Sequence, residues 1–304
     1  MMQDGSIYAS RIPSGTAPRT VTEGVLVLEG GAWRGLYTQG ALDVLMENGI
    51  LFQTTIGISA GAMSGIAYQV GKIGWSARWN LNHRMDPEYF GLGAFRREHG
   101  ISGFSYFFEN AGKEEEFDRG RFFSTDREFI VGATDCRSGK IHYFRKNREK
   151  DRLHFDRVIA ASSSVPYISE PVTIDGVPYL DGSCAMNIPY HLALRLGKRK
   201  VFVLKTQHRS FRAKVRGSNL LASAIYRKSY PNLLRALQSN HQRYNEILDE
   251  IALDEAQGRI FVLAPSTPVA IGNFERDLGK LSDLYWQGYR DMSRRMEELR
   301  TFLA

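Results

Sequence analysis

The chain has 304 residues, of which 43% are hydrophobic and 24% are charged, and its net charge is +7. This is the composition of an ordinary globular protein, so it excludes a disordered chain and a small disulfide-rich scaffold. No apolar run approaches the roughly 18 residues of a membrane-spanning helix, and residues 1–20 lack the apolar stretch of a secretory signal. Cys136 and Cys184 match no metal or redox spacing, which favours reduced thiols and a cytoplasmic location.

The positive charge belongs to one part of the chain. Residues 182–245 contain 13 of the 40 lysines and arginines and no acidic residue, so 27 basic residues face 33 acidic ones elsewhere. A basic segment attracts phosphates, but residues 208–228 carry no nucleic-acid fold signature, and Phe211 and Tyr226 are too sparse for base stacking. We expect no nucleic-acid partner. Peripheral contact with an anionic membrane is the milder expectation, and a solvated basic face is the alternative.

The first elements alternate between strands and helices. Residues 1–22 are polar and interrupted by proline and glycine, which predicts a flexible leader. The run 25–28 predicts a buried strand, a glycine-rich turn follows, and helical spacing extends over 36–48. A second strand at 54–58 precedes a helix that begins at Ser59 and runs past residue 68. Two such units predict a parallel sheet with functional residues at the carboxyl ends of its strands.

The sequence Gly57-Ile58-Ser59-Ala60-Gly61 has the pattern of a nucleophile elbow. A serine there lies on a sharp turn between a strand and a helix, where side chains two residues before and after it would collide with both elements. Gly57 and Gly61 remove those side chains, so the hydroxyl group of Ser59 is predicted to point outward. A serine that only caps the following helix is the alternative.

The earlier turn, Glu29-Gly30-Gly31-Ala32-Trp33-Arg34-Gly35, fits no phosphate-binding motif. Ala32 occupies the second glycine position of a dinucleotide fingerprint, and no lysine follows the last glycine as a P-loop requires. Adjacent glycines just after a strand offer closely spaced N–H groups instead. This arrangement is typical of an oxyanion hole, with Gly30, Gly31 and Ala32 as its donors.

The rest of the chain continues the pattern of strands and helices. Residues 75–125 predict a partly helical insertion that shapes a substrate entrance. The later expectations are strands at 128–134, 140–144, 200–204 and 259–263, and helices at 155–162, 190–196, 233–255 and 280–302. No internal repeat is evident.

Two Asp-Gly pairs lie close together at residues 175–182. Asp175-Gly176 separates two short apolar runs, which predicts a two-residue hairpin turn. Asp181-Gly182-Ser183 follows the second run, so the Asp181 carboxylate is expected at a strand terminus, at the same edge of the sheet as the elbow serine. Asp181 is the better candidate for a catalytic base.

Taken together, the turn at 29–35, the elbow at 57–61 and Asp181-Gly182-Ser183 resemble the motifs of the patatin-like phospholipases. The resemblance covers about residues 23–205 and includes Asn187-Ile188-Pro189, whereas Ala32 and Ser183 depart from the family pattern. It implies a three-layer α/β/α fold with a central, mainly parallel sheet. The domains expected are a flexible leader (1–22), a catalytic core (23–205) and a mostly helical C-terminal region (206–304) packed on the core or continuing it, as in a bacterial subgroup.

The resemblance also implies a Ser–Asp dyad without histidine, acting on acyl esters of lipids as a phospholipase A or a lysophospholipase-like esterase. Ser59 is expected to attack the ester, Asp181 to accept its proton, and Gly30, Gly31 and Ala32 to bind the oxyanion. Gly57, Gly61 and Gly182 are expected to support the site. Arg34 is expected either to brace the turn or to bind a lipid phosphate. No metal or other cofactor is expected.

Two alternatives remain open at this stage. In a Ser-Asp-His order, His191, His208 or His241 would serve as the base. In a different functional class, the chain would be a basic protein that binds lipid or membrane surfaces with weak or no hydrolase activity.

Overall fold

A computed structural model describes residues 4–111, 113, 119–148, 151–214 and 224–304. Within this part of the chain, a central sheet has the strand order β10-β9-β2-β3-β5-β8-β7, and β6 pairs with β5. Pairing is parallel from β10 to β5, whereas β6, β7 and β8 add antiparallel pairs, so the expected mainly parallel sheet is confirmed. The strands are β2 (Thr22–Leu28), β3 (Phe52–Ile58), β5 (Glu128–Asp135), β6 (Ile141–Arg145), β7 (Val172–Ile174), β8 (Val177–Asp181), β9 (Val201–Leu204) and β10 (Phe261–Leu263).

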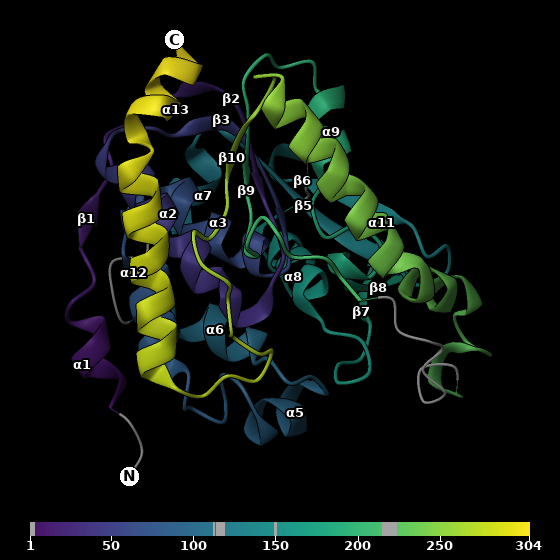
Figure 1. The fold of residues 1–304 in the computed structure, drawn as a ribbon. Coiled ribbons are helices and arrows are strands. Elements are labelled where there is room, and N and C mark those ends of the chain that lie inside the picture. Colours follow the sequence, from purple (N-terminus) through teal and green to yellow (C-terminus); the bar gives the residue numbers. More distant parts are fainter. Residues whose placement is uncertain (1–3, 112, 114–118, 149–150, 215–223) are drawn as a thin grey trace.

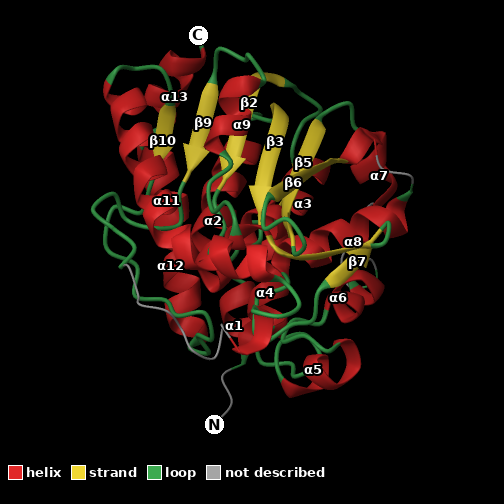
Figure 2. Cartoon of the chain, turned by 90° about the vertical axis from the view of Figure 1, so that its right-hand side faces the viewer, coloured by secondary structure: helices red, strands yellow, loops and turns green. Residues whose placement is uncertain are grey.

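Helices cover both faces of the sheet and make three layers (Figures 1 and 2). Successive side chains of a strand point to opposite faces. On β2, Leu26 and Leu28 therefore join one buried cluster, and Val25 and Val27 join another. The first cluster includes side chains of α2 (Gly35–Glu47), α3 (Ala60–Val70), α8 (Arg152–Ser163), α12 (Leu278–Arg294) and α13 (Met296–Leu303), and the second includes side chains of α9 (Tyr190–Arg195) and α11 (Pro231–Ala256).

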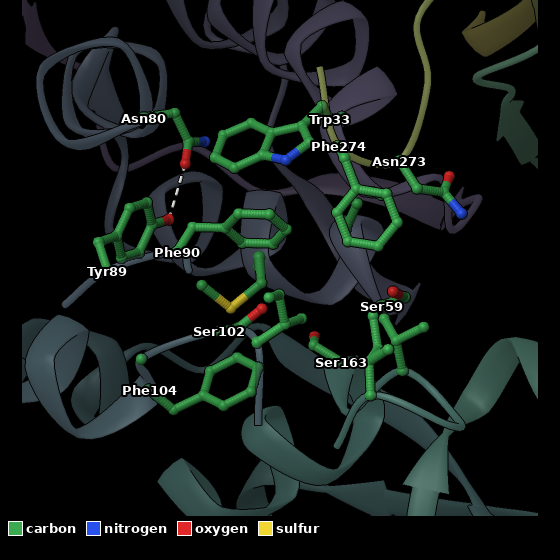
Figure 3. A pocket seen from close by; sticks show the side chains of 18 of the residues that line it. Trp33, Ser59, Asn80, Tyr89, Phe90, Ser102, Phe104, Ser163, Asn273 and Phe274 are labelled. Carbon is green, nitrogen blue, oxygen red and sulfur yellow. Dashed lines mark hydrogen bonds between the residues drawn. The ribbon is translucent and has the colours of Figure 1, made fainter. Parts of the chain in front are cut away.

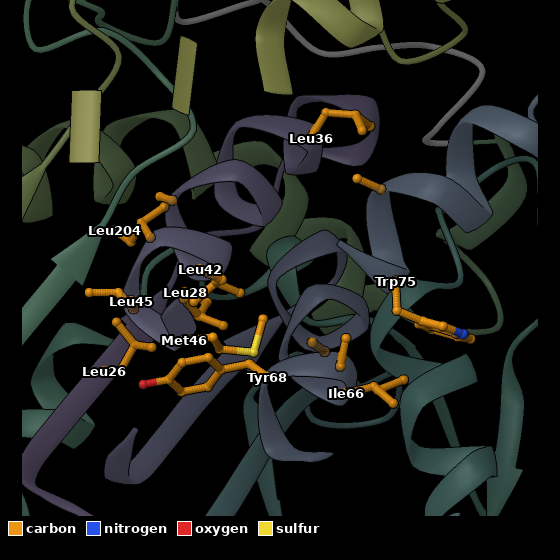
Figure 4. Close-up of a cluster of buried hydrophobic side chains, with 14 of the residues drawn as sticks. Leu26, Leu28, Leu36, Leu42, Leu45, Met46, Ile66, Tyr68, Trp75 and Leu204 are labelled. Carbon is orange, nitrogen blue, oxygen red and sulfur yellow. The ribbon is translucent and has the colours of Figure 1, made fainter. Parts of the chain in front are cut away.

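The first cluster is the larger one, and it includes Leu28 and Leu36, which flank the glycine-rich turn, and Ala62, which follows the elbow. Figure 4 shows Leu26 and Leu28 of β2 beside Leu42, Leu45 and Met46 of α2. These side chains are almost completely buried. They hold α2 and α3, the helices that follow the two turns, against the parallel strands.

The strands and helices expected up to residue 263 are present, although their ends move by a few residues. The hairpin turn is also confirmed, because Asp175 and Gly176 both have positive φ, at 47° and 77°, between β7 and β8. Residues 75–125 contain α4 (Trp75–His83), α5 (Leu92–Glu98), α6 (Phe104–Asn110) and α7 (Arg119–Ser124).

One expectation differs from the structure, and the flexibility of the leader stays a prediction. The final helix, expected as one piece, is interrupted at Arg295, whose guanidinium group donates to the carbonyl oxygen of Val262 at 2.5 Å and lies over the Phe261 ring. In the leader, α1 (Gly5–Ala9) packs against α4 and α12, and β1 (Gly15–Thr16) pairs with β4 (Lys72–Ile73). Residues 1–3 lie outside the described part, and the domain boundaries stay a prediction.

Helices α2 and α12 carry the same short motif, Tyr-x-Gln-Gly-x-x-Asp, although no repeat was expected from the sequence. The hydroxyl group of Tyr37 on α2 donates to Oδ2 of Asp291 on α12 at 3.2 Å. In return, Tyr285 on α12 donates to Oδ2 of Asp43 on α2 at 2.7 Å. Each tyrosine therefore bonds to the aspartate of the other helix.

The glycine of each motif lets the two helices touch. A Cβ atom on Gly40 would lie 2.1 Å from the carbonyl oxygen of Tyr285, and one on Gly288 would lie 2.0 Å from that of Tyr37. No side chain fits at these distances, so backbone meets backbone at both positions. Because α2 begins where the glycine-rich turn ends, this contact fixes the helix that supports the turn.

Within the described residues, no helix has the length and apolar character required to cross a membrane.

Candidate active site

Ser59 lies between the end of β3 and the start of α3, with φ of 52° and ψ of −121°. This backbone conformation is rare for a residue with a side chain and is the one that a nucleophile elbow imposes. A Cβ atom on Gly57 would lie 2.8 Å from the backbone of Ala62, and one on Gly61 would lie 2.5 Å from the carbonyl oxygen of Leu28. The two glycines are therefore sterically required by the turn.

Asp181 reaches Ser59 because β8 continues along β5 where β3 ends. Ile58 of β3 pairs with Gly132 of β5, and Asp181, the last residue of β8, pairs with the next residue, Ala133. The hydroxyl group of Ser59 donates to Oδ2 of Asp181 at 2.7 Å. The two candidates are thus brought into direct contact, but by an antiparallel strand rather than by another parallel one.

The Asp181 carboxylate is buried and held in place. Its residue is 2% exposed, its Oδ1 accepts from the amide of Ser183 at 2.8 Å, and Thr134 donates to its carbonyl oxygen at 2.9 Å. Burial raises the pKa of Asp181, and the hydrogen bonds from Ser59 and Ser183 act in the opposite direction. A Cβ atom on Gly182 would lie 2.3 Å from the carbonyl oxygen of Gly132, so glycine is needed directly after the carboxylate.

The glycine-rich turn lies beside the elbow, and its amide groups differ in their partners. The N–H of Gly30 donates to the carbonyl oxygen of Asn187 at 3.2 Å. Among the described residues, the N–H groups of Gly31 and Ala32 have no backbone acceptor. Ala32 has φ of 48°, a conformation that glycine adopts more readily. The N–H groups of Gly31 and Ala32 are therefore not bonded to other backbone groups, and their role as oxyanion donors stays a prediction.

The buried carboxylate of Glu29 holds the start of this turn in place. It is 2% exposed, and its carboxylate accepts from the amide of Thr206 at 2.5 Å and from the hydroxyl group of Tyr244. Thr206 also donates to the carbonyl oxygen of Gly30 at 3.0 Å. The turn is thus tied to the segment just after β9 and to α11.

Arg34 and Ser59 line different cavities. Arg34 lines a second cavity of about 570 Å³ together with Arg212, Lys214 and His241. Its Nε atom is buried and has no hydrogen-bond partner among the described residues. Most residues of its wall belong to the basic segment 182–245, of which residues 215–223 are outside the described part.

Ser59 opens into a largely apolar pocket of about 320 Å³ (Figure 3). Its wall comes from the turn and α2, from α3, from the insertion between α4 and α6, from the segment after α8, and from a loop before α12. The insertion therefore lines the pocket, and its role in shaping a substrate entrance stays a prediction. The larger side chains of the wall are those of Trp33, Leu36, Met63, Tyr89, Phe90, Phe104, Val165, Tyr167, Ile168 and Phe274.

None of the three candidate histidines lines this pocket. Nε2 of His191 lies 2.5 Å from a carboxylate oxygen of Glu250, and Nδ1 of His208 lies 2.7 Å from the hydroxyl group of Ser210. His241 lines the second cavity. Among the described residues, no group of three or more histidine, cysteine or acidic side chains is arranged to hold a metal ion.

Three contributors to the site carried no usable signal in the sequence. Ser162 accepts from the amide of Ser59 at 3.0 Å and donates to the carbonyl oxygen of Gly132 at 2.7 Å, which holds the elbow to β5. Asn273 and Phe274 also line the pocket, although they follow Ser59 by more than 200 residues in the sequence. Such long-range partners have no local motif by which a single sequence identifies them.

Comparison with known proteins gives two family matches. The model of the patatin-like phospholipase family matches residues 26–194, and that of a domain of unknown function (DUF6363) matches residues 230–304. The chain belongs to the patatin-like phospholipase family.

Among curated proteins, the uncharacterized protein YjjU of Escherichia coli strain K12 is 25% identical to the chain over 258 residues, which are 82% of this chain and 71% of YjjU. The crystal structure of VipD from Legionella pneumophila covers 95% of this chain and 69% of its own, at 11% identity and a TM-score of 0.49.

Proposed function

We propose that this protein is a serine acyl hydrolase of lipid esters that uses Ser59 and Asp181 as a catalytic dyad. The observation that carries the proposal is the 2.7 Å hydrogen bond from the Ser59 hydroxyl group to Oδ2 of buried Asp181, at the base of an apolar pocket. Membership of the patatin-like phospholipase family supports the lipid substrate. The finer assignment is a phospholipase A or a lysophospholipase-like esterase.

In the first half of the reaction, Oγ of Ser59 bonds to the ester carbonyl carbon while its proton passes to Oδ2 of Asp181. The negative charge that develops on the carbonyl oxygen is stabilised by the N–H groups of Gly31 and Ala32. Gly30 is not assigned as a donor, because its N–H already bonds to Asn187. The intermediate then expels the alcohol, which takes the proton from Asp181 and leaves an acyl group on Ser59.

In the second half, a water molecule attacks the acyl carbon and gives its proton to Asp181. The same N–H groups stabilise the second oxyanion. When the bond to Oγ breaks, the fatty acid leaves and the proton returns from Asp181 to Ser59. Asp181 therefore ends each cycle as a carboxylate.

Burial makes an aspartate a stronger base than it is in water. The raised pKa of Asp181 increases its affinity for the serine proton, and the direct hydrogen bond means that the proton crosses no intermediate group. Arg34 is assigned no part in the chemistry at Ser59, because it lines the second cavity and not the pocket of Ser59. The mechanism requires no metal or cofactor.

The first test is the hydrolysis of p-nitrophenyl butyrate, followed by a panel of phospholipids and lysophospholipids. Ser59→Ala and Asp181→Asn should each lower kcat/KM by at least about a thousandfold, because each removes a group that acts in the transition state. A fluorophosphonate probe should label the wild type and not Ser59→Ala. Circular dichroism of both variants shows whether the fold is retained.

His191→Ala, His208→Ala and His241→Ala serve as matched controls and should keep activity near that of the wild type. Loss of activity in one of these variants would indicate a catalytic triad that includes that histidine and would contradict the dyad. A folded wild type that neither hydrolyses an ester nor reacts with the probe would favour the second candidate function, a basic protein that binds lipid or membrane surfaces. The observation that favours this candidate is the second cavity, which is lined by Arg34, Arg212 and Lys214.

A further inference from the structure

The loop that precedes α12 supplies part of the pocket of Ser59. Asn273 and Phe274 line this pocket, and both belong to residues 230–304, which match the domain of unknown function. In the view of Figure 3, the Phe274 ring lies between Trp33 and Ser59. The side chain of Phe274 is apolar yet 55% exposed, so it stands at the mouth of the pocket rather than in the core.

Arg84 ties this loop to the pocket wall. Its Nη2 donates to the carbonyl oxygen of Phe274 at 3.0 Å, and its Nε donates to that of Glu275 at 2.5 Å. Its guanidinium group also lies over the rings of Trp33 and Phe90, at 4.4 and 4.7 Å. Arg84 is only 3% exposed, so a buried cation fixes the backbone at the residue that lines the mouth.

The two ends of the loop are fixed by α12. Near the start, the amide of Ser266 donates to Oδ2 of Asp291 at 2.9 Å, the same oxygen that accepts from Tyr37 of α2. At the end, the side chain of Asp277 caps α12 by accepting from the amide of Lys280. Because α12 is held on α2 by backbone contact, the loop has a fixed position relative to Ser59.

We propose that the C-terminal region is a specificity element of the active site, in which Phe274 contacts the acyl chain of the substrate and Arg84 is the residue that positions it. This inference rests on the proposed hydrolase function. An acyl chain that extends from Ser59 through the mouth passes the Phe274 ring, and its methylene groups leave water there. Each methylene group so buried contributes a factor of about four to binding.

The size of the effect depends on chain length. A butyryl group has few methylene groups to place against the ring, whereas a dodecanoyl group has many. Contact with two or three methylene groups gives an advantage of at least about tenfold. Phe274 therefore favours long acyl chains over short ones.

The test compares kcat/KM for p-nitrophenyl dodecanoate and p-nitrophenyl butyrate. In Phe274→Ala, the ratio of the two should fall by about tenfold, and Phe274→Leu should restore part of it. The change should be a higher KM for dodecanoate with kcat retained, since the contact is made equally in the ground and transition states. Phe95→Ala is the matched control, because Phe95 is an exposed phenylalanine of α5 that does not line the pocket.

An Arg84→Gln variant tests the positioning role separately. It should lower the same ratio while hydrolysis of butyrate is retained, because the catalytic groups are untouched. An unchanged ratio in Phe274→Ala, with normal butyrate hydrolysis, would overturn this inference and leave the proposed function standing. A folded wild type that hydrolyses neither ester nor any lipid of the panel, and that does not react with the fluorophosphonate probe, would overturn both.

Discussion

At the scale of single residues, the site depends on a serine held in an unfavourable conformation. A residue with a side chain at φ of 52° and ψ of −121° costs on the order of 1–3 kcal/mol, which the surrounding structure must offset. Gly57 and Gly61 make room for the turn, and the hydrogen bond from the amide of Ser59 to Ser162 secures it. In this conformation, the hydroxyl group of Ser59 donates to Asp181 and lies at the pocket.

The raised pKa of Asp181 predicts the pH dependence of catalysis. The carboxylate must be ionised to accept the serine proton, so kcat/KM should rise as the pH passes upward through the pKa of Asp181 in the free enzyme. Because burial raises that pKa, the acidic limb should have its midpoint above the ordinary value of about 3.9. A pH–rate profile with p-nitrophenyl butyrate measures it.

Asp181→Glu provides the control for this assignment, because a different carboxyl group should move the midpoint if activity is measurable. A profile that stays flat down to pH 4 in the wild type would contradict a base with a raised pKa.

At the scale of elements, the pair of α2 and α12 holds the catalytic core and the C-terminal region together. The contact is unusually close, since a Cβ atom at either motif glycine would lie about 2 Å from a carbonyl oxygen. Close approach lets each tyrosine reach the aspartate of the other helix. The two glycines therefore contribute because they have no side chain to keep the helices apart.

Gly288→Ala should reduce the free energy of unfolding by about 2 kcal/mol. Alanine favours a helix over glycine by about 1 kcal/mol, but its methyl group at 2.0 Å from the carbonyl oxygen of Tyr37 forces the helices apart. Urea unfolding measures the difference. Gly272→Ala is the control, because a Cβ atom there has no neighbour within 4 Å, and it should change stability by less than about 0.5 kcal/mol. Equal losses in both variants would contradict the close contact.

The sequence predicts those features that depend on residues close together in the chain. The elbow, the strand before it and the Asp175-Gly176 hairpin each depend on a few adjacent residues, and all are present in the structure. The bonds from Arg84 to the loop before α12 join residues about 190 positions apart, and the Tyr37–Asp291 bond joins residues 254 positions apart. No periodicity within one segment encodes such pairs, although the sequence does contain the repeated Tyr-x-Gln-Gly-x-x-Asp motif.

At the scale of the whole molecule, we propose that residues 206–304 continue the core and do not fold separately. β10 extends the parallel sheet beyond β9, α11 covers one face, and α12 covers the other. Leu204 of β9 pairs with Leu263 of β10, so the C-terminal region also closes an edge that would otherwise be exposed.

A fragment that ends at residue 205 should therefore fail to fold. It would lose the buried surface of α11 and α12 and leave β9 unpaired on one side. Soluble yield and the near-ultraviolet circular dichroism of the fragment, compared with the full chain, measure this. A soluble fragment with the aromatic signal of a packed core would show that residues 206–304 are dispensable for folding.

The pairing of α2 with α12 has the geometry of an isologous dimer interface built inside one chain. The tyrosine–aspartate bond and the glycine contact each occur twice, with the partners exchanged, as they do across the two-fold axis of a homodimer. An α12 supplied by a second copy would meet the same glycine, tyrosine and aspartate on α2. Exchange of α12 between two copies would thus conserve every contact of this interface, and the length and conformation of the loop at 264–277 decide whether each helix returns to its own chain.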